Sequence, residues 1–125
     1  MKLLSLKASI YQPLVSIIPF VIMRRLGFGN LVIVYYHIVN DVDVPHIRHL
    51  YKYKSILQFV SDIEFLLKHY VPVGLLDVIQ CRKGVYCLPK NSVHLTFDDG
   101  LREIYDIIAP ILLNKGIPAT YFVSS

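Results

Sequence analysis

The stretch VHLTFDDG, residues 93–100, is the segment around which the rest of the chain is organised. Apolar side chains alternate through its first five positions, which is the pattern of a short β-strand, and Gly100 is a natural end for that strand. Neighbouring residues of a strand point to opposite faces, so Asp98 and Asp99 can reach the same site only where the chain turns. In parallel α/β folds the carboxyl ends of the strands form the rim on which active sites are built. We therefore place the two aspartates at such a rim.

The residues after this strand predict a helix and then a second strand. Residues 101–115 carry apolar side chains at helical spacing, and Pro110 is expected to bend or restart that helix. Gly116 stands where a C-cap glycine belongs. Residues 119–123 are typical of another buried strand. Residues 93–123 are thus predicted to form one strand–helix–strand unit of the usual ~30 residues.

A resemblance to a known family rests on four motifs: TFDDG at 96–100, APIL at 109–112, KGIP at 115–118 and ATYFV at 119–123. Together they resemble the opening of the polysaccharide deacetylase domain, carbohydrate esterase family 4. The resemblance implies a metal-dependent hydrolase on a (β/α) barrel, often distorted to seven strands. Members remove acetyl groups from amino sugars of chitin-like or peptidoglycan-like polymers, or from xylan esters. The plain alternative for Asp98-Asp99-Gly100 is a solvated turn.

Acetyl removal explains why such a site needs two carboxylates. An amide carbonyl resists neutral water, and a divalent metal helps by polarising the carbonyl and lowering the pKa of a bound water. A nearby carboxylate then takes the proton as the water attacks. The resemblance implies that Asp98 is this catalytic base and that Asp99 is a ligand of the metal, with zinc as the first expectation.

The run LVIVYY at residues 31–36 is continuously apolar, β-branched and aromatic, which predicts a strand buried on both faces. His37 follows directly. Deacetylase domains frequently open with a strand that ends in Tyr-His, and Tyr36-His37 resembles that ending. His37 is therefore a candidate for the active-site rim beside Asp98, and the alternative is a hydrogen-bonded structural histidine.

Between these strands the pattern predicts a helix from Ser55 as N-cap to about Tyr70, a short strand or extended link at 71–73, and a brief helix at 75–80. The expected core-facing residues of the long helix are Ile56, Phe59, Val60, Ile63, Leu67 and Tyr70.

Two other groups of possible metal ligands are weaker. His46 and His49 have i, i+3 spacing, but their segment is a predicted loop with no third ligand close by. Cys81 and Cys87 have five residues between them, which fits no zinc pattern. Two reduced thiols are favoured over a disulfide.

The N-terminal segment differs in charge from the rest of the chain. Residues 1–40 hold four basic residues and no acidic one, whereas the remaining nine basic and nine acidic residues balance, so the net charge of +4 arises there. No basic stripe with interleaved aromatics accompanies it, which argues against a nucleic-acid partner. Residues 8–23 are uncharged, too short for the ~20 of a membrane span, and lack a signal-peptide cleavage site.

Two interpretations of this segment stay open: a membrane-surface helix within residues 1–25, or a helix packed on the domain. A cell-envelope or membrane-associated location is favoured over a cytoplasmic one. The predicted domain boundaries are 1–28 for the apolar, basic-flanked segment and 29–125 for the N-terminal part of a polysaccharide deacetylase domain.

The fold class predicted is α/β, a partial (β/α) barrel with about four strands that stops after the strand at 119–123. Four strands are too few to close a barrel. The family's histidine ligands, base-orienting arginine and acid histidine all lie downstream of the Asp-Asp-Gly motif. We therefore expect a fragment or truncated product that binds no metal alone.

Three functions are compatible with these sequence features to different degrees. The first is the N-terminal portion of a metal-dependent deacetylase acting on an acetylated polysaccharide, a hydrolase of carbon–nitrogen bonds other than peptide bonds. The second is a non-catalytic, membrane-associated remnant. The third, a phosphoacceptor receiver domain, fits less well, because its acidic pair follows the first strand.

Overall fold

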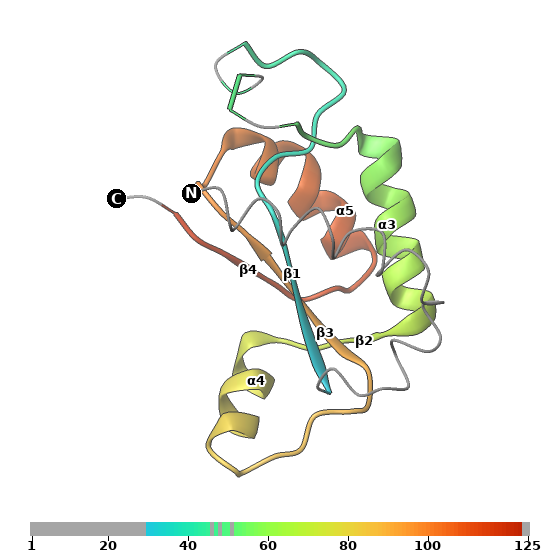
Figure 1. The fold of residues 1–125 in the computed structure, drawn as a ribbon, viewed down its shortest axis with the longest axis vertical. Coiled ribbons are helices and arrows are strands. Elements are labelled where there is room, and N and C mark those ends of the chain that lie inside the picture. Colours follow the sequence, from blue (N-terminus) through green and yellow to red (C-terminus); the bar gives the residue numbers. More distant parts are fainter. Residues whose placement is uncertain (1–29, 46, 48, 51, 124–125) are drawn as a thin grey trace, which may run out of the picture.

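The computed structural model describes residues 30–45, 47, 49–50 and 52–123, which form a parallel sheet with helices packed beside it (Figure 1). The elements follow in the order β1 (Leu31–Tyr36), α3 (Ile56–His69), β2 (Val71–Pro72), α4 (Leu75–Arg82), β3 (Ser92–Phe97), η1 (Ile104–Ile108), α5 (Ala109–Asn114) and β4 (Ala119–Tyr121). All strand pairs are parallel. The α/β class and the four strands predicted from the sequence are confirmed in this part of the chain.

Strand β3 is the centre of the sheet. On one side it pairs with β1 along its whole length, from Leu31↔Ser92 to Tyr36↔Phe97. Its other side is shared, because β2 pairs with its first residues and β4 with Leu95–Phe97. The carboxyl ends of β1, β3 and β4 consequently lie at the same edge of the sheet.

The main core lies between β3 and the helices α3, η1 and α5. Side chains from alternate positions of β3 enter it and pack against residues of these helices. Its buried members are Val39, Phe59, Ile63, Val93, Leu95, Phe97, Ile104, Ile108, Leu112 and Ile117. The core therefore joins the predicted strand–helix–strand unit to the long helix that precedes it.

The opposite face of β3 is buried although it carries polar side chains. His94 is 3% exposed, and both of its ring nitrogens have partners. Its Nδ1 lies 2.8 Å from the carbonyl oxygen of Val73, and its Nε2 lies 2.9 Å from Oγ1 of Thr120. His94 thus bridges the two segments that share one side of β3, and the buried polar atoms are satisfied as burial requires.

The prediction that β1 is buried on both faces was wrong. Ile33 and Tyr35 are 57% and 68% exposed, while Val34 and Tyr36 pack against the core. Among the described strands β1 pairs only with β3, so it is an edge strand, and the face that carries Ile33 and Tyr35 is only partly covered. An apolar run reveals that a strand is hydrophobic but does not reveal whether a second layer covers it.

Helix α3 begins and ends as predicted, but two of the expected core-facing residues, Val60 and Leu67, do not belong to the core cluster. Ser55 caps the helix: its hydroxyl accepts from the Gln58 N–H at 3.2 Å, and the Gln58 amide oxygen accepts from the Ser55 N–H at 3.0 Å. The expected core residue Leu67 is instead 39% exposed. Leu66 takes that place against the core, because it continues the i, i+3 spacing from Ile63.

The helix after β3 restarts at Pro110, as predicted, and does so through a widened turn. The Ala109 N–H donates to the carbonyl of Ile104, five residues earlier, and α5 begins with Pro110 in its first turn. A proline ring clashes with the carbonyl four residues before it, and a π-type turn gives that carbonyl room. The helix then ends at Gly116 in a Schellman motif, with φ +64° at the glycine and the Ile117 N–H on the Leu112 carbonyl at 2.9 Å.

Within the described residues, no helix is both long enough and apolar enough to cross a bilayer. The predicted membrane-surface or packed helix of residues 1–28 lies outside the part of the chain that the structure describes.

Candidate active site

The candidate site lies where β1, β3 and β4 end side by side. The Asp98 N–H donates to the carbonyl of Tyr36 at 3.0 Å, and the Phe122 N–H donates to the carbonyl of Phe97 at 2.8 Å. These bonds continue the sheet ladder one residue beyond the strands. The backbone at Asp98 is therefore held by the sheet itself and does not depend on a mobile loop.

The structure brings His37 and Asp98 together, as expected from their positions at neighbouring strand ends. The His37 Nε2 lies 3.9 Å from Asp98 Oδ2, and both side chains are partly exposed. This distance is too long for a hydrogen bond, and it becomes an ion pair only when the imidazole is protonated. The pair is open to a ligand arriving from solvent.

Asp99 and Gly100 form the turn that the sequence required. Both adopt left-handed backbone angles, with φ +71° and +60°. Aspartate tolerates this region better than most residues, yet it remains uncommon and is a recognised feature of functional turns. Because the chain turns here, Asp99 is freed from the strand alternation that would have sent it away from Asp98.

Gly100 is also required by close packing. A Cβ at this position would lie 2.9 Å from Val123 Cγ1 and 3.2 Å from Val123 Cα. The segment after β4 therefore lies directly against the Asp-Asp-Gly turn. The turn that carries Asp99 is supported on one side by this segment.

Three aromatic rings support the rim from below, one from the last position of each strand. The rings of Tyr36 and Phe97 stack with centroids 5.7 Å apart, and those of Phe97 and Tyr121 stack at 5.4 Å. Phe59 of α3 meets Tyr36 edge-on at 5.2 Å. Such pairs each add roughly 0.5–1.5 kcal/mol beyond area burial. Sequence reasoning missed this ladder, although aromatic residues ended the runs 31–36 and 93–97 and stood within 119–123.

Tyr36 is also tied to α3 through a carboxylate. Its hydroxyl donates to Asp62 Oδ2 at 3.0 Å, and the Lys54 ammonium pairs with the same oxygen. Burial raises the pKa of the Tyr36 phenol well above its ordinary value, and the hydrogen bond and negative charge of Asp62 raise it further. Tyr36 therefore stays neutral near pH 7 and acts as a fixed donor that holds Asp62.

The described residues do not by themselves fit a metal site. Among them, no three side chains of His, Cys, Asp or Glu gather as a metal-binding group. A zinc site takes three or four protein ligands, and a single carboxylate such as that of Asp99 does not make one. The His46/His49 alternative lies partly outside the described residues.

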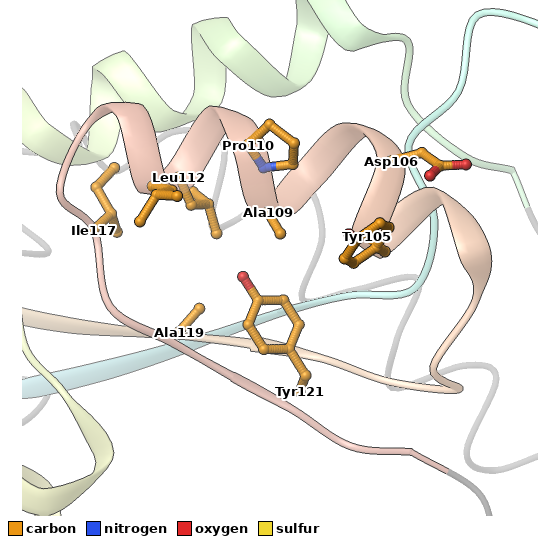
Figure 2. A pocket seen from close by; sticks show the side chains of 9 residues that line it. Tyr105, Asp106, Ala109, Pro110, Leu112, Ile117, Ala119 and Tyr121 are labelled. Carbon is orange, nitrogen blue, oxygen red and sulfur yellow. The ribbon is translucent and has the colours of Figure 1, made fainter.

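Two of the clefts in the described structure include residues from the carboxyl ends of the strands, Tyr121 in one and Tyr36 in the other. The larger, of about 580 Å³, lies between β4 and the η1–α5 helix, and Figure 2 shows the Tyr121 hydroxyl pointing into it. Its lining is mainly apolar. The second, of about 480 Å³, lies beside the end of β1 and includes His37. The second cleft therefore includes the histidine that lies beside Asp98.

These features define a class of protein: a parallel α/β fold with adjacent carboxylates at the carboxyl ends of its strands. Residues 86–125 match the family model described as polysaccharide deacetylase. No curated protein matches the chain.

Solved structures similar to the chain agree with that family. The de-N-acetylase from Aggregatibacter actinomycetemcomitans is 29% identical with a TM-score of 0.60, over 73% of this chain and 36% of that one. IcaB from Ammonifex degensii is 27% identical with a TM-score of 0.65, over 75% and 38%. The Streptococcus pyogenes deacetylase PplD in complex with acetate shares the fold, with 23% identity and a TM-score of 0.63 over 76% and 42%.

The resemblance to polysaccharide deacetylases is thereby confirmed, as is the partial barrel predicted from the sequence. The chain spans only 36–42% of the length of these three solved structures.

Proposed function

We propose that the chain supplies the N-terminal portion of a metal-dependent polysaccharide deacetylase, which hydrolyses amide- or ester-linked acetyl groups on a carbohydrate polymer. The observation that carries this proposal is the Asp98-Asp99-Gly100 turn. It follows the central parallel strand, it has two consecutive left-handed residues, and it lies inside the segment that matches the family model.

Asp98 is the proposed general base. Its backbone is anchored by the Tyr36 carbonyl, and its partly exposed carboxylate faces His37 at the rim. A carboxylate held in this way can accept the proton of a water that attacks the acetyl carbonyl. His37 is the proposed rim residue that lines the approach to this carboxylate.

Asp99 is the proposed ligand of a divalent metal, with zinc as the first expectation from the family. Bound metal would supply a polarised carbonyl and a more acidic water. At the turn, Asp99 no longer follows the alternating side-chain directions of the strand, and a site shared with Asp98 requires this. The resemblance to the family implies that the remaining ligands lie downstream of the Asp-Asp-Gly motif, in the part of the domain that the rest of a deacetylase would supply.

A second candidate, a non-catalytic remnant, is favoured by one observation: the described residues hold no complete metal-binding group. The two candidates differ in whether a metal site forms once the rest of a deacetylase domain is present. An experiment that supplies the rest of the domain therefore distinguishes them.

The test is a chimera in which residues 30–123 replace the matched part of the Aggregatibacter actinomycetemcomitans de-N-acetylase. Acetate release from N-acetylglucosamine oligosaccharides is measured with and without a chelator. The deacetylase proposal expects release that chelation abolishes, and no release by residues 1–125 alone. A folded chimera that releases no acetate would favour the remnant, and chelator-sensitive release by the isolated chain would show that its site is already complete.

A further inference from the structure

The cleft beside the end of β1 has walls fixed by several bonds. It is formed by the last residues of β1 and the segment 52–54, and it includes His37, the neighbour of Asp98. Its lining residues are Val34, Tyr35, Tyr36, His37, Ile38, Lys52, Tyr53 and Lys54. Asp98 itself is not among these lining residues, and the cleft approaches the proposed base through His37.

The segment 52–54 is held against the end of β1 by its backbone. Val39 and Lys54 form a parallel β-bridge, and the Asn40 N–H donates to the Lys54 carbonyl at 3.1 Å. The Tyr53 hydroxyl accepts from the Val44 N–H at 2.9 Å and donates to the Val42 carbonyl at 3.2 Å. The second wall of the cleft is thus pre-formed, as binding sites for small ligands usually are.

Two side chains of this cleft are available to a ligand. Tyr35 is exposed, and its ring is packed edge-on against the His37 ring, with centroids 5.8 Å apart. Lys52 is exposed and forms no ion pair with a described carboxylate, whereas the charge of Lys54 is compensated by Asp62. One wall therefore offers a flat apolar ring and the other offers a free ammonium with three donors.

We propose that this cleft is a sugar-binding subsite for the residue next to the acetylated sugar in the polymer. The Tyr35 ring packs against the apolar C–H face of a pyranose, and the Lys52 ammonium donates to its hydroxyl or carboxylate oxygens. Aromatic rings with a polar rim suit such amphipathic ligands, because one surface is apolar and the other needs hydrogen bonds. This inference rests on the proposed function, since the position of Asp98 defines which sugar reacts.

The experiment titrates the full chain, residues 1–125, with N-acetylglucosamine tetramer up to millimolar concentration and follows backbone amides by NMR. We expect saturable shifts centred on the β1 end and residues 52–54. Tyr35→Ala should weaken the apparent Kd about two- to tenfold, the loss of one aromatic contact, and Lys52→Gln should weaken it measurably. Matched controls are Tyr105→Ala, an 80% exposed tyrosine at the other cleft, and Lys90→Gln, and both should leave the Kd unchanged.

Three outcomes would overturn the subsite: no saturable binding, shifts confined to other regions, or a Kd that Tyr35→Ala leaves unchanged. The chimera separates this inference from the proposed function. In the chimera, Tyr35→Ala should raise KM with little change in kcat. A chimera that releases no acetate would contradict the proposed function, whereas binding of the tetramer by residues 1–125 that depends on Tyr35 would still support the subsite.

Discussion

Replacing Gly100 with alanine tests how tightly the Asp-Asp-Gly turn is supported. Two terms oppose the substitution. An L-residue in the left-handed region costs about 1–2 kcal/mol, and Gly100 has φ +60°. The new Cβ would also lie 2.9 Å from Val123 Cγ1 and 3.2 Å from Val123 Cα, and overpacking of this kind costs about 1–3 kcal/mol. We therefore expect Gly100→Ala to lower the free energy of unfolding by about 2–5 kcal/mol.

Gly116→Ala is the matched control for this substitution. Gly116 has nearly the same backbone angle, φ +64°, but a Cβ there would meet no atom within 4 Å. It should lose only the conformational term of about 1–2 kcal/mol. Urea denaturation of the purified chain, followed by circular dichroism, gives both values. Equal losses for the two variants would show that the segment after β4 does not lie against the turn and would refute the packing argument.

Three further expectations concern the helix cap at Ser55, the buried phenol of Tyr36 and the N-terminal segment. Ser55→Ala should cost about 1 kcal/mol of unfolding free energy by removing the capping box, whereas Ser61→Ala, at an exposed position within α3, should cost nothing measurable. The pKa of Tyr36 is raised in the folded state, so the stability that its neutral phenol contributes is complete below its unfolded pKa of about 10 and declines as the pH rises toward the folded pKa. Tyr36→Phe should remove this decline. The same variant should also lose one phenol that ionises late in a titration followed by ultraviolet absorbance. Deleting residues 1–25 should reduce sedimentation of the chain with anionic vesicles if the apolar, basic-flanked segment binds membrane surfaces, and equal binding by the shortened chain would favour a packed helix.

The elements that sequence reasoning predicted best are those whose signals are local. The cap at Ser55, the restart at Pro110 and the end at Gly116 each depend on a few adjacent residues, and the structure confirms all three. Backbone geometry at these positions is set locally, because proline lacks an N–H donor, glycine lacks a side chain and serine has a short hydroxyl that caps the helix. The alternation in residues 93–97 likewise identified the central strand.

What sequence reasoning missed depends on contacts between distant segments. The exposed face of β1 could not be predicted, because the pattern of LVIVYY is the same whether or not another layer covers it. The bridging role of His94 required knowledge that β2 and β4 share one side of β3. The aromatic ladder required the strand register, which a single sequence does not contain.

The candidate site was predicted in position but only partly in surroundings. Asp98 and His37 meet at the rim because their strands are neighbours in register, as the motif positions implied. The cleft beside them was not predicted, because it depends on residues 52–54 returning to the end of β1 through a loop without periodic signal.

The roles proposed for the two carboxylates are distinguished by the metal content of the two variants and not by their rates. In the chimera, Asp99→Ala should lower both bound metal and turnover, because one of about three protein ligands is removed. Asp98→Asn should leave the metal bound and the fold intact while turnover falls about 10²–10⁴-fold, the range for loss of a general base. Loss of metal in Asp98→Asn with retention in Asp99→Ala would mean that the roles are exchanged.

The most direct measurement is acetate release by the chimera compared with its Asp98→Asn variant at equal metal content. The proposed function predicts chelator-sensitive release by the chimera and a loss of about 10²–10⁴-fold in the variant. Full activity in both the Asp98→Asn and Asp99→Ala variants would contradict it, and would reduce the Asp-Asp-Gly motif to a turn at the end of β3.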